Sequence, residues 1–351
     1  MTTAVEAPSR PPSATYQRRR LWCGITGIGL ILVTLWIAAP LGLAGALDQA
    51  FANWPPELAG AIAALLLAFG ASLLQAGPDI AAFRTEVAFG QRRDGVGIFG
   101  PYLVHLFQWT GGLVVAGAVV GFSVRLGGDA WWLLTIAGLL VLSFVHVVYP
   151  LSPTSRVPAP DSSWWLRVSA ELEAMNLPVP NVAWYDHGER SLAGGWNGVG
   201  PTRKLFLATS LSEVEPKIAA GLIAREFGHL KLGHRLTTTV ATIAWIAGGI
   251  ALTWLLSDHG PAGTVVVLAT VMSTWCWLGL LGLWPSLGRR QVLQADWFAA
   301  EKLGADDARR MLDELSRRNL PDETLPAGVA FVFHPIPPMD DRRRHLSLKF
   351  R

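Results

Sequence analysis

Long runs of apolar residues without a charge recur along this chain and alternate with shorter polar segments. Six such runs span Leu21–Leu47, Leu58–Pro78, Pro101–Val124, Ala130–Pro150, Leu236–Ser257 and Ala262–Pro285. Each reaches the roughly 20 residues that a helix needs to cross a bilayer. Charged residues make up only 16% of the chain, whereas an ordinary soluble domain carries about 25%. The pattern predicts an integral membrane protein, mainly α, with about six transmembrane helices.

The distribution of arginine between the short loops predicts the orientation. The N-terminal tail carries Arg10, Arg18, Arg19 and Arg20, and the second loop carries Arg84, Arg92 and Arg93. The connections at 48–56 and 258–261 carry no Lys or Arg. Because positive loops stay inside, we expect both termini and the segments 151–235 and 286–351 in the cytoplasm, at the plasma (inner) membrane.

Charge and cysteine content exclude two other classes. The net charge of +3 comes mostly from arginines that flank the apolar runs, and no basic stripe with interleaved aromatic residues is present, so we expect no nucleic-acid partner. Cys23 and Cys276 both fall in predicted membrane helices without metal-ligand spacing. They predict neither a disulfide framework nor a metal site.

The polar segments predict a small α+β unit. A helix from Trp164 to Met175, capped by Asp161 and Ser162, precedes strands at Asn181–Tyr185 and Lys204–Ala208, with a loop or irregular edge strand at Gly188–Gly200 between them. Ser212-x-x-Glu215 has the form of a capping box that opens the next helix. Further helices are expected at Gln291–Leu303 and near Asp306–Arg318, and a proline-rich turn at 334–338.

The helix after Glu215 carries the most informative motif, Arg225-Glu226-Phe-Gly-His229. In an H-E-x-x-H helix the two histidines lie four residues apart on one face and bind one zinc ion. The glutamate between them polarises the zinc-bound water. Here Glu226 and His229 are in place, but Arg225 occupies the first ligand position. A guanidinium has no lone pair to offer a metal.

Several separated motifs resemble the membrane zinc metallopeptidases that include the HtpX heat-shock protease and the type 1 CAAX prenyl protease. They are Leu-Pro-Val-Pro-Asn-Val at 177–182, Lys204–Leu211, Glu226–His234, Gln294-Ala-Asp-Trp-Phe-Ala at 294–299, and His334-Pro followed by Pro337 and Arg342. The resemblance implies a cytoplasmic zincin-like domain of two parts, at 151–235 and 286–351. A disordered tail at 1–20, four transmembrane helices at 21–150 and two at 236–285 complete the organisation.

The departures from this family concern its metal site. By resemblance, Glu226 holds the general-base position, His229 is a retained metal ligand, and His334 joins the catalytic set. The third zinc ligand of the family is a Glu four residues before Asp296, where this chain has Val292. The Asn-Ala pair of the substrate-edge strand appears as Ser191-Leu192. The resemblance therefore implies a degenerate member that lacks two of three zinc ligands.

Two interpretations of the site remain open. A rebuilt zinc site would need other donor atoms, and the candidates are His187, His234, His334 and Asp296. His234 follows His229 by five residues, and in a continuous helix this spacing points the two side chains in different directions. Alternatively, Arg225 replaces the zinc electrostatically and pairs with Asp296, while Glu226, adjacent in sequence, does not face it. In that case we expect no cofactor, and we expect Asp296 and His234 to lie behind the ligand positions and contact the residues that occupy them. The opposing interpretation of Arg225 is a side chain that reaches out to water.

Three functions follow from these interpretations. The first is an inactive pseudopeptidase that binds peptide or membrane-protein segments, or regulates a partner, with Lys204–Ala208 as the edge for strand addition. The second is an active zinc metalloendopeptidase of the HtpX/CAAX protease type with substituted ligands. The third is a membrane protein that binds a lipid or a small molecule. The near absence of charge inside the apolar runs argues against an ion transporter.

Overall fold

The computed structural model describes residues 13–92, 99–148, 157, 161–186, 192, 194–319 and 336–349. Its α-helices are α1 (Ser13–Ala38), α2 (Leu43–Ala50), α3 (Pro56–Ala88), α4 (Phe99–Gly127), α5 (Trp131–Val148), α6 (Ser162–Ala174), α7 (Pro216–Lys231), α8 (His234–Leu256), α9 (Pro261–Leu281), α10 (Leu283–Leu303), α11 (Ala305–Asn319) and α13 (Met339–Lys349). Its strands are β1 (Val182–Tyr185), β2 (Gly194–Asn197) and β3 (Lys204–Ala208), and short 3-10 helices are η1 (Gly128–Ala130), η2 (Gly200–Thr202) and η3 (Thr209–Glu213).

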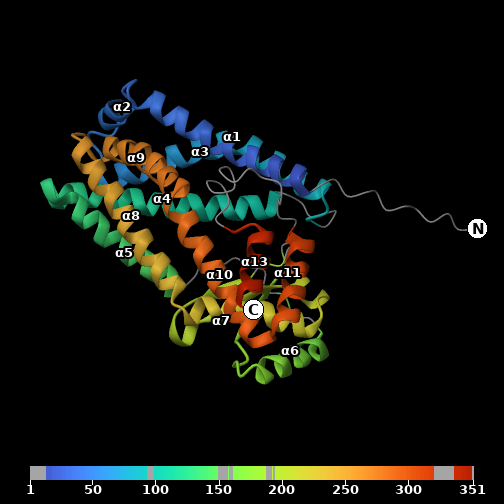
Figure 1. Ribbon diagram of the computed structural model, residues 1–351. Coiled ribbons are helices and arrows are strands. Elements are labelled where there is room, and N and C mark those ends of the chain that lie inside the picture. Colours follow the sequence, from blue (N-terminus) through green and yellow to red (C-terminus); the bar gives the residue numbers. More distant parts are fainter. Residues whose placement is uncertain are drawn as a thin grey trace, which may run out of the picture.

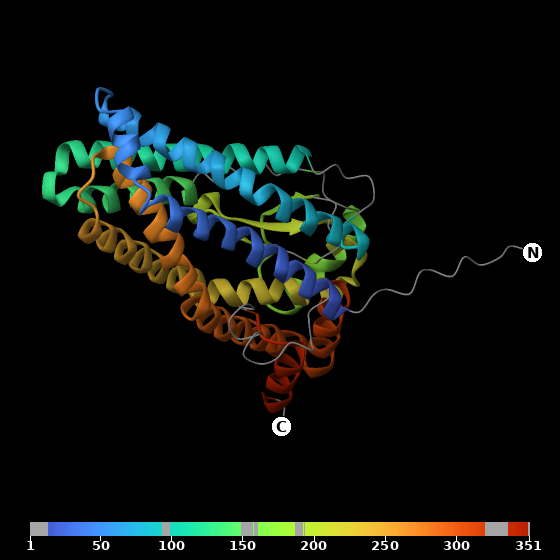
Figure 2. The ribbon, with the colours of Figure 1, turned by 90° about the horizontal axis from the view of Figure 1, so that it is seen from above.

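The molecule has two parts, a bundle of long apolar helices and a smaller head (Figure 1). We use "bundle" for α1–α5, α8 and α9, and "head" for α6, α7, α10, α11, α13 and the sheet. The long helices diverge from the end of the bundle that carries α2 (Figure 2). Each part has its own apolar core, and Trp164, Ile223, Leu312 and Leu346 belong to the core of the head.

Within the described residues, five helical stretches are long and apolar enough to cross a membrane, which supports the prediction of an integral membrane protein. They are Thr15–Ala38, Pro56–Ala88, Leu106–Val145, His234–Leu256 and Pro261–Leu281. The third and fourth predicted runs both fall in Leu106–Val145, where α4 and α5 pack against each other as a hairpin joined by η1. The count of six crossings stays a prediction.

Three of the predicted boundaries in this part of the chain are wrong. Helix α1 begins at Ser13, inside the tail at 1–20 that was expected to be disordered. The run Leu21–Leu47 is not one helix, because α1 ends at Ala38 and the turn through Pro40 and Gly42, with a φ of 87° at Gly42, separates it from α2. The helix predicted to end at Pro78 instead continues to Ala88, where a loop was expected. Pro78 removes one hydrogen bond of α3, and the packing of α3 against α1 and α4 keeps the helix continuous.

Helices α3 and α4 approach closely because glycines line their contact. A Cβ on Gly60 would collide with the carbonyl oxygen of Gly117, and one on Gly121 with that of Pro56. Small residues at such contacts let membrane helices bring their backbones together, so that van der Waals contacts replace a hydrophobic driving force that lipid cannot supply.

Asp48 of α2 connects α2 to the N-terminus of α9 at the end of the bundle that carries α2. Its carboxylate accepts hydrogen bonds from the backbone N–H groups of Gly260 and Gly263, both at 2.8 Å, and so caps the N-terminus of α9. Replacing Asp48 by alanine is expected to lower the free energy of unfolding by about 0.5–2 kcal/mol, the usual loss for a helix cap. Thermal melting of the detergent-solubilised chain measures this loss of stability. The control is Asp129→Ala, at an exposed position of η1, and equal melting temperatures of the two variants would contradict the role of Asp48 as a cap.

The sheet of the head has the order β1-β3-β2. β1 pairs with β3 in parallel, with Val182 opposite Leu205, and β2 pairs with β3 antiparallel, with Gly195 opposite Phe206. Both strands expected from the sequence are present, and Gly188–Gly200 contains an edge strand. The expectation that Lys204–Ala208 is an open edge is wrong, because β3 is the central strand and β2 lies at the edge.

Helix ends in the head agree with the sequence only in part. Asp161 caps α6, since its carboxylate accepts from the N–H of Ser163 at 2.9 Å. The capping box before α7 is wrong: Glu215 precedes Pro216 without a side-chain cap bond, and Ser212 donates to the carbonyl of Thr209 instead. Helix α10 begins at Leu283, earlier than expected, and α13 was not predicted.

Candidate functional site

Helices α7 and α10 bring the motif residues together. They pack along each other in the head, and the contact is close at Gly228, where a Cβ would lie 3.0 Å from Cβ of Phe298 and 3.2 Å from Cα of Ala295. Glycine at 228 therefore allows the turn that carries Arg225 to face the turn that carries Asp296. Residues separated by two membrane helices in sequence thus form one site.

Asp296 is the centre of this site and is 1% exposed. Its Oδ1 accepts a hydrogen bond from Nε of Arg225 at 3.0 Å, as one of the two interpretations of the sequence expected. Arg342 of α13 binds the same carboxylate in a bidentate manner, with Nε at 2.7 Å from Oδ2 and Nη2 at 2.8 Å from Oδ1. One carboxylate therefore joins α7, α10 and α13 through charge-assisted hydrogen bonds.

Glu226 also belongs to this cluster, contrary to the expectation from helix geometry. Nη1 of Arg225 lies 3.1 Å from Oε1 of Glu226. Adjacent helix positions do not face each other, but the long arginine side chain bends to reach both carboxylates. The formal charges of Arg225, Arg342, Glu226 and Asp296 sum to zero. The alternative, that Arg225 reaches out to water, is wrong, since its side chain is only 17% exposed.

Burial and charge act in opposite directions on the ionisation of these groups. Burial favours neutral Arg225, but the Asp296 and Glu226 carboxylates outweigh it and raise the pKa of Arg225 above its ordinary value. Burial raises the pKa of Glu226, the Asp296 carboxylate adds to this rise, and Arg225 opposes it. Arg225 is therefore a permanent cation at the position that the motif resemblance assigns to the first metal ligand.

His229 lies against His234, which corrects the expectation that the two point apart. Helix α7 ends at Lys231, and Gly233, with a φ of 66°, turns the chain so that α8 begins at His234. Nδ1 of His234 is 3.0 Å from Nδ1 of His229, and its Nε2 is 2.9 Å from Oε1 of Gln294. The prediction assumed one continuous helix through His229 and His234, and it is wrong because α7 ends before His234.

The hydrogen bonds of this pair determine its tautomers. Since Gln294 offers an oxygen to Nε2 of His234, that nitrogen carries the proton, and Nδ1 of His234 accepts from Nδ1–H of His229. Nε2 of His229 then keeps its lone pair. Burial, followed by the charges of Arg225 and His234, lowers the pKa of His229 to about 3, so its ring is neutral near pH 7.

These residues do not fit a catalytic zinc ion. Of the three ligand positions that the motif resemblance implies, Arg225 has no lone pair, Val292 is buried and has no donor atom, and only His229 is a ligand type. Within the described ranges, no three His, Cys, Asp or Glu side chains gather closely enough to hold a metal. Asp296 is already committed to two arginines. The candidates His187 and His334 lie outside the described residues.

The predicted substrate edge is only partly described. Ser191 lies outside the described residues. The backbone of Leu192 is bound by the side chain of Asn319, whose Oδ1 accepts from the N–H of Leu192 at 2.8 Å and whose Nδ2 donates to its carbonyl at 3.4 Å. The amide thus takes the place of a neighbouring strand, and the backbone of Leu192 is not an open edge.

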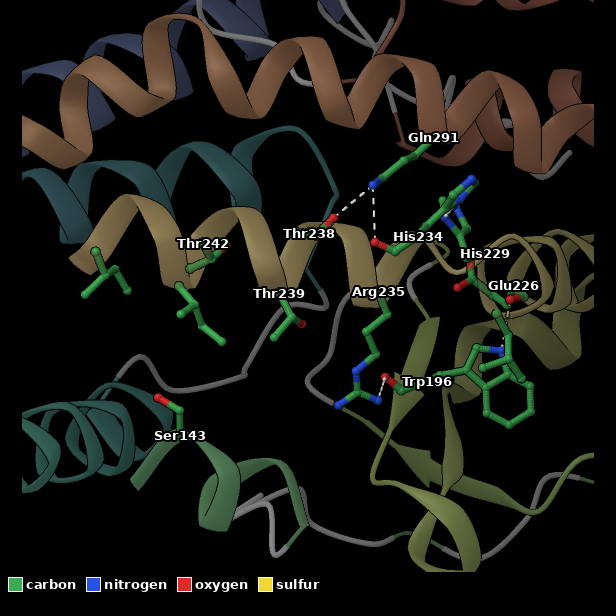
Figure 3. Close-up of a pocket in the computed structure, with 13 residues that line it drawn as sticks. Ser143, Trp196, Glu226, His229, His234, Arg235, Thr238, Thr239, Thr242 and Gln291 are labelled. Atoms are coloured by element: carbon green, nitrogen blue, oxygen red, sulfur yellow. Dashed lines mark hydrogen bonds between the residues drawn. The ribbon is translucent and has the colours of Figure 1, made fainter. Parts of the chain in front are cut away.

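A cleft of about 470 Å³ lies between this cluster and the bundle (Figure 3). Glu226, His229 and Trp196 line its head side, and Ser143 of α5 faces Thr239 and Thr242 of α8 across it. The remaining lining residues are Leu230, His234, Arg235, Thr238, Ile243, Ile246 and Gln291. The cleft therefore continues from the peptidase-like motif into the membrane-facing helices.

Sequence reasoning missed most of these lining residues. Trp196 of β2 donates from Nε1 to the carbonyl of Glu226 at 2.9 Å, and Arg235 donates to the carbonyl of Gly198 at 3.0 Å. Gln291 of α10 donates to Thr238 at 2.9 Å. The run of threonines at 237–239, where an apolar span begins, was the available signal, because such hydroxyls often bind neighbouring membrane helices.

Comparison with known proteins shows the fold. No family model matches the chain, and no curated protein does. The crystal structure of Ste24p from S. mikatae matches with a TM-score of 0.63 at 15% identity, over 80% of this chain and 74% of Ste24p. The chain has a Ste24p-like fold. At this identity the match shows the fold alone.

Proposed function

We propose that this chain is a metal-free pseudopeptidase of the membrane, which binds an extended peptide or a membrane-protein segment and does not cut it. The observation that carries the proposal is the ion pair between Arg225 and Asp296, at 3.0 Å, where the motif resemblance expects a metal ligand at position 225. The guanidinium group of Arg225 thus takes the place of a bound metal ion.

Loss of two ligands removes the route to an activated water. Glu226 in a zinc peptidase acts on a water that the metal polarises. Here Arg225 binds Glu226 directly, and Val292 offers no donor. The Glu226 side chain therefore has a structural role in the charge cluster, and the cleft beside it is left for binding.

One end of the cleft offers contacts for a peptide backbone, and the other end offers apolar contacts. The edge strand β2 borders it through Trp196, and an extended segment can add to such an edge by backbone hydrogen bonds. Beyond Glu226, the threonines of α8 lead to Ile243 and Ile246. This continuation favours a segment with an apolar part, and it also favours the second candidate, an amphipathic lipid or small molecule. In both cases the head would lie in the cytoplasm, as the arginine distribution predicts.

Binding without cleavage is the test. The full chain in detergent is expected to bind a fluorescein-labelled unfolded casein in a saturable manner and to leave it intact, with or without a zinc chelator. Thr242→Trp fills the cleft and should weaken binding at least about tenfold, or about 1.4 kcal/mol. Thr237→Trp, an exposed position of α8 outside the cleft, should not.

Two outcomes would contradict the proposal. Chelator-sensitive cleavage of the casein would establish the alternative, an active zinc metalloendopeptidase with substituted ligands. Equal binding by both tryptophan variants would remove the cleft as the binding site. Displacement of the casein by a detergent-like lipid at low mole fraction, lost in Thr242→Trp, would favour the lipid candidate over the peptide.

A further inference from the structure

The bundle end of the cleft is lined by one face of helix α8. Six of the lining residues follow the spacing i, i+3, i+4, i+7, i+8 and i+11, which places their side chains on the same side of the helix. In chain order they are Arg235, Thr238, Thr239, Thr242, Ile243 and Ile246. The charged and hydroxyl groups come first and the isoleucines come last, with Ser143 of α5 opposite them (Figure 3). The face therefore changes from polar to apolar along the helix.

This change follows the depth of a membrane. Helix α8 begins at His234 and is one of the stretches long and apolar enough to cross a bilayer. Ile246 follows Arg235 by eleven residues, which is about 16 Å along the helix axis. One leaflet of the hydrocarbon core is about 15 Å thick. With α8 across the bilayer, Arg235 lies at the level of the lipid headgroups and Ile246 lies near the middle.

Arg235 brings a positive charge to this face without a counter-charge. Its Nη1 donates to the carbonyls of Gly198 at 3.0 Å and Trp196 at 3.4 Å, and its Nη2 donates to Oδ1 of Asn197 at 3.5 Å. These neutral oxygens hold the guanidinium in place and leave its charge uncompensated. Arg203 lies close enough for its own charge to act on Arg235. Within the ranges that the structure describes, neither arginine forms an ion pair.

Two positive charges without a carboxylate favour an anion as the ligand. A partly buried guanidinium is costly without a counter-charge, and guanidinium groups bind phosphate oxygens through charge-assisted hydrogen bonds. The hydroxyl groups of Thr239 and Thr242 follow on the same face, and neither forms a hydrogen bond within the described part of the chain. The Glu226 carboxylate at the head end of the cleft is already paired with Arg225, at 3.1 Å.

The apolar end of the cleft suits a hydrocarbon chain better than an extended peptide. At membrane depth the backbone N–H and C=O groups of a peptide need hydrogen-bond partners. The backbone of α8 uses its own groups within the helix, and β2, the edge strand that borders the cleft, lies in the head. An acyl chain has no polar group to satisfy, so it can lie along Ile243 and Ile246.

We propose that the bundle end of the cleft binds an anionic phospholipid, with its phosphate on Arg235 and an acyl chain along Ile243 and Ile246. The lipid reaches the cleft between α5 and α8, where Ser143 and Thr239 are exposed. The site rests on the second candidate of the proposed function, an amphipathic ligand in this cleft. It leaves the edge of β2 at the head end open to a peptide.

Lipid binding by the full chain in neutral detergent is the test. The chain is titrated with dioleoyl phosphatidylglycerol or dioleoyl phosphatidylcholine, and bound lipid is counted by native mass spectrometry. Phosphatidylglycerol is expected to bind at least about tenfold more tightly, because its headgroup carries no cation to oppose the arginines. Arg235→Gln should remove this preference. Arg290→Gln removes the same charge at an exposed position of α10 outside the cleft and should keep it. Ile246→Trp should weaken the binding of both lipids equally.

Three results would overturn the lipid site. They are equal binding of the two lipids by the wild type, a preference that survives in Arg235→Gln, and binding of soluble glycerol 3-phosphate as tight as that of phosphatidylglycerol. If Arg235→Gln does not fold, phosphatidylglycerol with a photoreactive diazirine on its acyl chain is bound to the wild type. Labelling near Ile243 and Ile246 then supports the site, and labelling only elsewhere overturns it.

Casein binding by the same chains separates this proposal from the proposed function. Casein binding without a lipid preference removes only the lipid site. A lipid preference without casein binding removes only the peptide site at the head end.

Discussion

Replacing Asp296 by asparagine is expected to lower the free energy of unfolding by about 3–5 kcal/mol, the usual loss when one partner of a buried ion pair is removed. Asp296 is 1% exposed, and Arg225 and Arg342 both bind its carboxylate. Asparagine keeps the shape of the side chain and removes its charge. Arg225 then keeps its pair with Glu226, Arg342 loses the carboxylate that it binds, and the contact between α7, α10 and α13 loses its central charge.

Thermal and chemical unfolding of the full chain in detergent measures this loss, and two variants calibrate it. Asp313→Asn removes an exposed pair with Arg343, at 3.0 Å, and should cost at most about 1 kcal/mol. Arg225→Met leaves Asp296 with both hydrogen bonds from Arg342, so its loss should be smaller than that of Asp296→Asn. An Asp296→Asn variant that melts like Asp313→Asn would show that the cluster contributes little.

The second large effect is a gain of metal. The double variant Arg225→His, Val292→Glu places two ligand types at the positions where the family resemblance expects them, beside His229. We expect about one zinc ion per chain in this variant, because a zinc site needs three protein ligands. The wild type should hold none, since a permanent cation occupies the first position and an apolar side chain the third.

Metal analysis of the purified chains after dialysis against trace zinc measures the gain. Arg225→His alone supplies only two ligands and is the matched control, which should bind zinc weakly. Zinc held tightly by the wild type would contradict the metal-free interpretation and would point to other ligands. A metal-free double variant that folds normally would show that the resemblance assigns position 225 or 292 incorrectly.

Local chemistry made the central pair of the site one of two open interpretations. Arg225 cannot lose its charge, so it needs either a carboxylate within reach or water, and the burial seen in the structure decided between them. The E-x-x-H helix and the helix of Asp296 both belong to recognisable motifs, so the partner could be named. The same reasoning found β1, β3 and α11, whose apolar patterns are local.

Prediction failed where the outcome depended on how helices end and pack. His229 and His234 meet because Gly233 turns the chain between them, and straight helix geometry misses this. Arg342 reaches Asp296 because α13 packs on the head, and the capping box before α7 gave way to a turn within η3. Helix α3 continues past Pro78 because its neighbours support it, which places Asp79 within a helix that can span the membrane.

The sequence by itself determined the class of this protein, a membrane chain with an E-x-x-H helix whose preceding residue, Arg225, cannot ligate a metal, because hydrophobicity, charge and ligand chemistry are properties of single residues and short segments. Only the tertiary structure decided which carboxylate the arginine meets, which strand is the open edge, and where the cavities lie. Those features depend on the packing of segments that are far apart along the chain, and the free energy of that packing is spread over many contacts that no local pattern records.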